Sequence, residues 1–257
     1  MLKSLLNISD LNSIELEEIL NVKKDENKLK GKNIGLLFEK PSTRTRLSFA
    51  VGIKHLGGEA IELRFEDLNI SRNESFEDTF RAMNCYLDGI IYRTTNHSRL
   101  SRASMFFSKP IINALSDISH PCQALSDLYT LKEYFGSLNL NILWMGDMNN
   151  VCYSLVESAN LISDLKLTIC SPLSISESIN WKMKSNITVT NNLDDIDFES
   201  INCVMTDVHI SMNDKESHQK AEMLKPYSVT TDLMSKTSSN CIFMPVSYTH
   251  LTLPTKA

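Results

Sequence analysis

The stretch that decides the fold reads Asn33-Ile-Gly-Leu-Leu-Phe38, continues as Glu39-Lys-Pro-Ser-Thr-Arg-Thr-Arg46 and closes at Gly57-Gly58. Its first part is a short apolar run, which is typical of a buried strand. Residues 44–56 read as a helix, which the glycine pair ends. The stretch therefore predicts one unit of strand, polar turn and helix.

The same unit recurs along the first half of the chain. Further core strands are expected at residues 88–93 and 110–115, and a helix at residues 121–134. An earlier helix is expected at residues 10–20, with Ser9 or Asp10 as its N-cap. Strands that alternate with helices favour a parallel sheet covered on both faces.

The pattern restarts after Gly136-Ser137, with a strand at 140–144, a turn at 146–150 and a helix at 151–162. Further strands are expected at 165–170, 187–190, 201–206 and 240–244, with a polar helix at 175–184. The predicted fold class is therefore α/β, in two tandem domains that each hold a mainly parallel sheet covered by helices. We expect the first domain to span residues 1–136 and the second to span residues 137–245.

Composition restricts the class of protein. The 257 residues are 42% hydrophobic, enough for a packed core, and the formal net charge of -5 argues against nucleic acid as a partner. No stretch reaches the roughly 18 apolar residues of a membrane span, and the N-terminus lacks the apolar run of a signal peptide. The six cysteines contain no Cys-x-x-Cys pair, which favours reduced thiols. We expect a cytoplasmic protein with neither nucleic acid nor a membrane as its partner.

The densest polar cluster lies between the expected strand at 33–38 and the helix that follows it. A helix N-terminus offers unpaired N–H groups; Ser42, Thr43 and Thr45 add hydroxyl groups, and Arg44 adds a bidentate fork. An ordinary N-cap with surface arginines is the simpler alternative, but the density of hydroxyl and guanidinium groups favours a phosphate cradle. Neither GxxxxGK[ST] nor GxGxxG is present, so no nucleotide motif is supported.

Other polar residues follow the next strands. Arg93 ends the strand at 88–93, and His120 and Gln123 open the helix after the strand at 110–115. Ligands of open parallel sheets collect beyond the carboxyl ends of the strands, so these residues are predicted to converge with the polar cluster. An imidazole and an amide suit a carbonyl group next to a phosphate. A capping or core role for His120 stays the alternative.

The second half offers fewer candidates. Asn149 and Asn150 open a helix directly after a strand, where an N-cap is the simplest interpretation. Asp207 leaves the strand at 201–206 and is either a turn former or the partner of an amino group. Ser211 and Met212 follow it in a loop.

Five motifs stand in order along the chain: FEKPSTRTRLSF at 38–49, YR at 92–93, HPCQ at 120–123, GDMNN at 146–150 and DVHISM at 207–212. In these motifs the chain resembles the ornithine carbamoyltransferase family, over about residues 5–244. The resemblance implies a first domain for carbamoyl phosphate and a second for the amino acid. It also implies a homotrimer with active sites at subunit interfaces, and a reaction without metal or organic cofactor.

The resemblance also assigns roles to residues of the first domain. Ser42, Thr43, Arg44 and Thr45 would hold the phosphate, with Arg93 beside it, and His120 and Gln123 would hold the carbamoyl group. Arg44, Arg93, His120 and Gln123 would thus form the catalytic set. Asn69 matches the position from which a neighbouring subunit reaches the phosphate, where the family often has Gln or His.

In the second domain, the resemblance implies that Asn150 contacts the carboxylate of L-ornithine and that Asp207 contacts its α-amino group. Ser211 and Met212 would belong to the loop that closes over this substrate. Asn213 stands where many members have glycine, and asparagine accepts the left-handed conformation better than most residues do.

The implied reaction transfers the carbamoyl group to the δ-amino group of ornithine and gives citrulline and phosphate. Aspartate carbamoyltransferases share the Ser-Thr-Arg-Thr and His-Pro-x-Gln signatures, so aspartate stays an alternative acceptor, although the Asp-x-x-x-Ser-Met loop favours ornithine. After Met244 the family continues with His-Cys-Leu-Pro, whereas residues 246–257 here resemble a non-native tail. A second hypothesis is therefore a truncated, catalytically impaired fragment that still binds carbamoyl phosphate.

Overall fold

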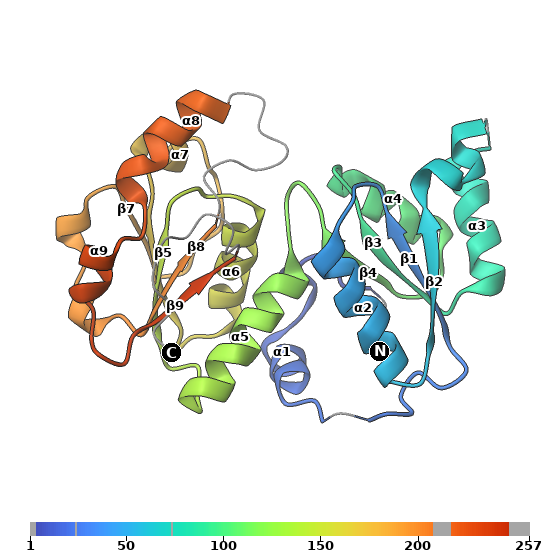
Figure 1. The fold of residues 1–257 in the computed structure, drawn as a ribbon, viewed down its shortest axis with the longest axis horizontal. Helices are drawn as coiled ribbons and strands as arrows, with labels where there is room; N and C mark the ends of the chain where they lie inside the picture. The colour runs from blue at the N-terminus through green and yellow to red at the C-terminus, as the bar shows by residue number, and fades with distance from the viewer. Residues whose placement is uncertain (1–3, 24, 73, 208–216, 247–257) are drawn as a thin grey trace. The chain divides into compact units, whose positions relative to one another are not determined.

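The computed structural model describes residues 4–23, 25–72, 74–207 and 217–246. The chain divides into two compact units, residues 1–127 and residues 128–257. Each unit is built around its own sheet, and Figure 1 labels the elements of both. The predicted tail at 246–257 lies, from residue 247 onward, outside the described residues.

The sheet of the first unit has the strand order β2-β1-β3-β4, and all its neighbouring strands run parallel. Its strands are β1 (Asn33–Phe38), β2 (Glu59–Arg64), β3 (Gly89–Arg93) and β4 (Ile111–Leu115). The predictions at 33–38, 88–93 and 110–115 are therefore confirmed as β1, β3 and β4. The sequence pattern does not predict β2, an edge strand whose burial pattern shows no apolar alternation.

Helices cover both faces of this sheet. Ile53 of α2 (Thr43–His55) packs with Leu36 and Ile91 on one face. The opposite face carries Leu37, which packs with buried residues of α3 (Phe76–Tyr86) and α4 (His97–Phe106). Because side chains alternate across a strand, the continuous apolar run of β1 supplies both cores.

The first helix begins later than the sequence predicts. The structure has a short 3-10 helix, η1 (Ile8–Asp10), and then α1 (Ser13–Leu20). Neither Ser9 nor Asp10 caps α1; the cap is Asn12, whose side chain accepts from the backbone N–H groups of Ile14 and Glu15. An asparagine that can accept two N–H groups of the first turn overrides the apolar spacing upstream of it.

The sheet of the second unit has the order β7-β6-β5-β8-β9, again with parallel neighbours. Its strands are β5 (Asn141–Met145), β6 (Lys166–Cys170), β7 (Ile187–Thr190), β8 (Cys203–Thr206) and β9 (Ile242–Pro245). Helix α6 (Asn150–Leu161) is largely buried, and α9 (Thr231–Ser235) contributes Leu233 to a core with Leu143 and Val204.

The polar helix predicted at 175–184 is wrong. Only α7 (Leu173–Ser176) forms there. The segment after it is held by contacts with α6, because Asn160 donates to the carbonyl oxygen of Lys182 and accepts from the N–H of Lys184. The ring of Trp181 also lies against that of Tyr153 at 5.1 Å. These tertiary contacts outweigh a weak helical propensity.

The remaining helices are shorter connections, apart from α5. They are η2 (Phe65–Asp67), η3 (Asn69–Arg72), α5 (Pro121–Phe135), η4 (Leu193–Asp195), η5 (Phe198–Ser200), α8 (Ser217–Leu224) and η6 (Lys225–Tyr227). In the part of the chain that the structure describes, no helix combines the length and the apolarity that crossing a membrane requires. Two parallel sheets flanked by helices confirm the predicted α/β class.

Candidate active site

The carboxyl ends of β1 and β3 lie side by side in the first unit. The two strands pair in parallel with Phe38 opposite Arg93, and the N–H of Glu39 donates to the carbonyl oxygen of Arg93 at 3.0 Å. This register brings the turn before α2 next to the side chain of Arg93. The sheet thus places the polar cluster where parallel sheets bind ligands.

Arg93 is the residue that joins the two segments. Its Nη1 donates to Oγ of Ser42 at 3.1 Å and to Oγ1 of Thr45 at 3.3 Å. Ser42 is the N-cap of α2 by its extended backbone, yet in the described part of the chain its side chain makes no capping hydrogen bond. The hydroxyl group is used by Arg93, so it does not satisfy the N–H groups of the first turn of α2.

The electrostatics of this cluster favour an anion. Burial and then the positive charge of Arg44 lower the pKa of Arg93, whose residue is 8% exposed. The Nε of Arg93 is buried and has no hydrogen-bond partner among the described residues. Two guanidinium groups beside a helix N-terminus are unfavourable together unless a negative charge binds between them.

His120 is held at the end of a tight turn. The N–H of Ser116 donates to the carbonyl oxygen of Ser119, and the N–H of Ser119 donates to Oγ of Ser116. The buried Asn113 of β4 donates to the same carbonyl oxygen at 3.2 Å. This turn delivers His120 to the start of α5.

The environment of His120 keeps its imidazole neutral. Burial, and then the positive charge of Arg93, lower the pKa of His120 to about 3. His120 thus lies near enough to Arg93 for the guanidinium charge to act on its imidazole. A neutral imidazole offers one N–H donor and no net charge near neutral pH.

Three further candidates of the first unit have distinct surroundings. Gln123, in the first turn of α5, donates from Nε2 to Oδ1 of Asp127 at 2.9 Å. Thr43 is exposed at the start of α2. Asn69 is exposed in η3, and within the described part of the chain no hydrogen bond joins its side chain to Ser42 or Arg93.

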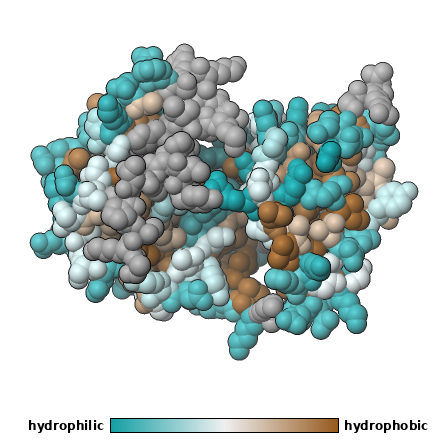
Figure 2. All heavy atoms as spheres, viewed as in Figure 1, coloured by the Kyte–Doolittle hydropathy of each residue, from teal (hydrophilic) through white to brown (hydrophobic). Residues whose placement is uncertain are grey.

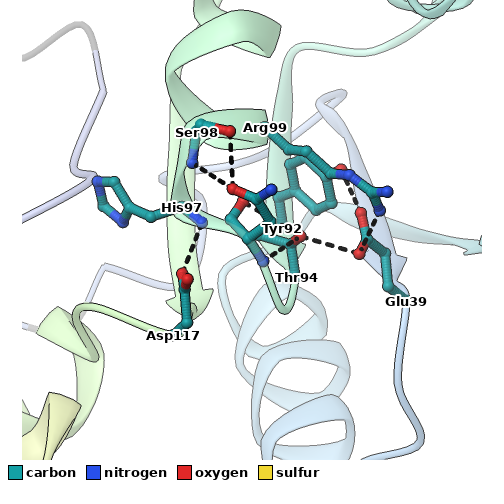
Figure 3. A network of polar contacts seen from close by, with 8 residues as sticks. Glu39, Tyr92, Thr94, His97, Ser98, Arg99 and Asp117 are labelled. Atoms are coloured by element: carbon teal, nitrogen blue, oxygen red, sulfur yellow. Dashed lines mark hydrogen bonds and ion pairs between the residues drawn. The ribbon is translucent and has the colours of Figure 1, made fainter.

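A second polar network, which the sequence analysis missed, lies next to this cluster (Figure 3). Glu39 accepts hydrogen bonds from the hydroxyl groups of Tyr92 and Thr94 and forms an ion pair with Arg99. Tyr92 and Thr94 flank Arg93 in the sequence, and Glu39 stands within the polar stretch that precedes α2. The sequence could have indicated this network, because its members stand close to Ser42 and Arg93 in the chain.

In the second unit the structure brings together Asn149 and Asp207. Asn149 caps α6 by accepting from the N–H groups of Val151 and Cys152, and its Nδ2 donates to Oδ2 of Asp207 at 2.7 Å. Asn150 is the first residue of α6. Ser211, Met212 and Asn213 lie outside the described residues.

An ion pair braces the turn from which α6 starts. Asp147 is buried and pairs with Lys220 of α8 at 2.7 Å, and its carbonyl oxygen accepts from Nε1 of Trp144 at 2.9 Å. No group of three or more potential metal-ligating side chains gathers among the described residues. The two units thus present one cationic cluster with a neutral imidazole and one small cluster of amide and carboxylate groups.

Comparisons with known proteins agree with this division. Residues 3–133 match the family described as "Aspartate/ornithine carbamoyltransferase, carbamoyl-P binding domain". Residues 138–247 match the family described as "Aspartate/ornithine carbamoyltransferase, Asp/Orn binding domain".

Two curated relatives and two solved structures illustrate the similarity. The ornithine carbamoyltransferase of Aquifex aeolicus is 38% identical over 262 residues, which cover 93% of this chain and 83% of that protein. The ornithine carbamoyltransferase of Rhizobium johnstonii is 35% identical and covers 94% of this chain and 84% of that protein. The solved ornithine carbamoyltransferase of Pyrococcus furiosus has a TM-score of 0.86 at 29% identity, over 98% of this chain and 86% of that chain. The solved ornithine carbamoyltransferase of Thermus thermophilus has a TM-score of 0.84 at 30% identity, over 98% of this chain and 87% of that chain.

Proposed function

The chain belongs to the aspartate/ornithine carbamoyltransferase family, and we propose that it transfers the carbamoyl group of carbamoyl phosphate to the δ-amino group of L-ornithine, giving citrulline and phosphate. The observation that carries this proposal is the bridge from Arg93 to Ser42 and Thr45. It supports an anion site in the domain that matches the carbamoyl-phosphate family.

The phosphate end of the substrate binds to the cationic cluster. Arg44 and Arg93 supply charge and bidentate donors, and Ser42, Thr43 and Thr45 supply hydroxyl groups next to the N-terminus of α2. The negative charge on the phosphate grows as the bond to the carbonyl carbon breaks. Donors fixed in advance around it therefore stabilise the transition state more than the ground state.

The carbamoyl end lies against His120 and Gln123. The uncharged δ-amino group attacks the carbonyl carbon, and negative charge develops on the carbonyl oxygen in the tetrahedral intermediate. His120 donates a hydrogen bond to that oxygen from an imidazole N–H. Its low pKa means that this donor is a neutral imidazole. The carbon–oxygen bond to phosphate then breaks, and the proton that the former amine loses passes to the departing phosphate. The chain's own groups orient and polarise the substrate, and none forms a covalent bond with it.

The amino acid binds in the second unit. Asn150 contacts the carboxylate of ornithine and Asp207 its α-amino group, and the hydrogen bond from Asn149 supports this placement of Asp207 by fixing one carboxylate oxygen. The relatives are named ornithine carbamoyltransferase, which supports ornithine over aspartate as the acceptor. The domains that carry the two halves of the reaction are proposed as residues 1–136 and 137–245.

We further propose that the active form is a cytoplasmic homotrimer in which Asn69 of one subunit reaches the phosphate site of the next. Helix α2, whose N-terminus belongs to the proposed phosphate site, also carries exposed apolar side chains. Leu47 and Val51, one helical turn apart on α2, are 58% and 47% exposed. Figure 2 shows apolar side chains on the surface of the first unit in this area. This exposed apolar surface supports the assembly, because a second copy would bury it.

A direct assay tests the proposed function. Purified chain is incubated with carbamoyl phosphate and ornithine, and citrulline is measured, with aspartate in place of ornithine as the comparison. Citrulline formation with no reaction of aspartate is the expected result. Binding of inorganic phosphate without any citrulline would instead support the alternative of a chain that binds carbamoyl phosphate but does not turn it over.

A further inference from the structure

A buried carboxylate lies directly behind the proposed phosphate site. Glu39 follows β1, and its side chain is 6% exposed. Its Oε1 accepts from the Tyr92 hydroxyl at 2.6 Å, and its Oε2 accepts from Oγ1 of Thr94 at 2.9 Å and from Nη1 of Arg99 at 2.8 Å. Figure 3 shows these side chains converging on Glu39 from β3 and from α4. Three donors on one carboxylate fix its position.

The backbone around this carboxylate is part of the phosphate site itself. The N–H of Glu39 donates to the carbonyl oxygen of Arg93, and Ser42 follows Glu39 by only three residues. Tyr92 and Thr94, which donate to Glu39, are the two neighbours of Arg93 in the chain. The Glu39 side chain therefore ties the segment that carries Ser42 to the segment that carries Arg93.

A carboxylate in this place also creates an electrostatic problem. Its negative charge repels a bound phosphate, and burial weakens the screening by water. Arg99 offsets this charge through the ion pair, and its hydrogen bond to Glu39 raises the pKa of Arg99. Burial, followed by the bond to Glu39, raises the pKa of Tyr92, so that the phenol stays a donor. The charges of Glu39 and Arg99 then cancel, so the network of Glu39, Tyr92, Thr94 and Arg99 carries no net charge.

We propose that Glu39 is a positioning residue for the phosphate site and that Arg99 is the counter-charge which makes this carboxylate compatible with a bound anion. Neither residue is proposed to touch the substrate. The identity of the anion as carbamoyl phosphate rests on the proposed function, whereas the arrangement of Glu39 and Arg99 does not.

The same helix offers a matched control for Arg99. Arg102 of α4 forms an ion pair with Glu77, and its guanidinium lies over the ring of Phe76 at 4.9 Å. The guanidinium of Arg99 lies over the ring of Phe65 at 5.6 Å in the same way. Arg102→Met therefore removes an equal charge, an ion pair and a ring contact from α4 without touching Glu39.

The experiment compares Arg99→Met, Glu39→Gln, the double variant and Arg102→Met in the full chain. For each, the KM values for carbamoyl phosphate and for ornithine are measured, together with the affinity for inorganic phosphate by calorimetry. Arg99→Met is expected to weaken both phosphate readouts about tenfold or more, because a charged hydrogen bond is lost and the carboxylate is left unpaired. The KM for ornithine is expected to stay within about twofold, since the second unit is unchanged.

Rescue in the double variant separates this role from a merely structural one. Glu39→Gln alone is expected to weaken phosphate binding only about threefold. The amide keeps one acceptor oxygen, and it removes the repulsion between the carboxylate and the bound phosphate. Adding Glu39→Gln to Arg99→Met is expected to restore most of the lost affinity, since no unpaired charge remains. Arg99→Lys keeps the charge and is expected to bind phosphate nearly as well as the unmodified chain.

Two results would overturn the proposal. One is a phosphate affinity of Arg99→Met equal to that of Arg102→Met, and the other is a double variant no better than Arg99→Met. If Arg99→Met fails to fold, the double variant still decides, because it buries no unpaired charge. A double variant that folds and binds phosphate supports the proposal, and one that also fails to fold overturns it. Absence of citrulline from the unmodified chain would defeat the proposed function alone, and the phosphate affinities would still test Glu39 and Arg99.

Discussion

Arg93 donates a hydrogen bond from Nη1 to the hydroxyl oxygen of Ser42 at 3.1 Å, across 51 positions of sequence. Taken alone, Ser42 is the start of a helix and Arg93 is the end of a strand. The hydrogen bond joins them into one donor set at the carboxyl ends of β1 and β3. Burial, and then the positive charge of Arg44, lower the pKa of Arg93, and this concentration of positive charge favours an anion as the ligand we propose.

Loss of Arg44 tests the anion directly. Arg44→Ala is expected to raise the KM for carbamoyl phosphate about tenfold or more, because a bidentate charged contact disappears. Arg81→Ala is the control, since Arg81 is exposed on α3, where it forms an ion pair with the exposed Asp78 and lies over the ring of Phe106 at 5.2 Å. Steady-state kinetics with carbamoyl phosphate as the varied substrate gives both values. Equal KM values for Arg44→Ala and the unmodified chain would remove the basis for the phosphate site.

The low pKa of His120 predicts how stability depends on pH. The pKa of His120 is about 3 in the folded chain against an ordinary value of 6.5, so the unfolded chain binds a proton between these values and the folded chain does not. The free energy of unfolding therefore falls as the pH drops from about 6.5 toward 3. His120→Gln is expected to flatten this fall, whereas His55→Gln, at an exposed position, is not. Denaturant unfolding at several pH values measures the difference, and parallel curves for His120→Gln and the unmodified chain would contradict the prediction.

Asn149 is expected to affect both stability and the second substrate. Asn149→Ala removes a cap on two N–H groups of α6, at a cost of about 1 kcal/mol, and releases Asp207. The KM for ornithine is expected to rise severalfold while that for carbamoyl phosphate stays constant. Asn12→Ala removes a similar cap from α1, and it should lower stability without changing either KM. A rise in the ornithine KM of both variants would assign the effect to stability alone.

The exposed apolar residues of α2 test the trimer. Val51→Glu is expected to shift the assembly from trimer toward monomer, because it places a charge in a surface that a second copy would bury. Met105→Glu is the control, since Met105 is 70% exposed on α4, which covers the opposite face of the sheet. Sedimentation velocity of both variants distinguishes them. A trimer that survives Val51→Glu would exclude this face as the contact.

Much of the fold was predictable because its strands are short apolar runs. The strand at 33–38 was predicted with its observed bounds. The bounds of β3, β4 and β5 to β9 each agree with a predicted strand to within a few residues. Edge position explains the failure at β2, whose Glu59 and Glu62 face solvent and leave no apolar pattern. The helix predicted at 175–184 is wrong for a different reason. Hydrogen bonds with Asn160 hold that segment, and the local sequence pattern contains no sign of these distant contacts.

The site was predictable only in part. Ser42 to Thr45 and His120 stand out by their density of polar groups and by their place at strand ends. Glu39 does not, because a glutamate after a strand is ordinarily a surface residue. Only the pairing of β1 with β3 shows that its carboxylate meets Tyr92 and Thr94. Partners contributed by a distant strand have no signature in the local sequence.

The register of β1 against β3 has a further consequence for how the protein folds. Phe38 lies opposite Arg93 in this pairing, so the anion site is absent from any intermediate in which the two strands have not yet met. Inorganic phosphate should thus slow the unfolding of the first unit. Above the dissociation constant for phosphate, the free energy of unfolding of this unit should rise in proportion to the logarithm of the phosphate concentration. A small ion becomes a reporter of long-range strand assembly.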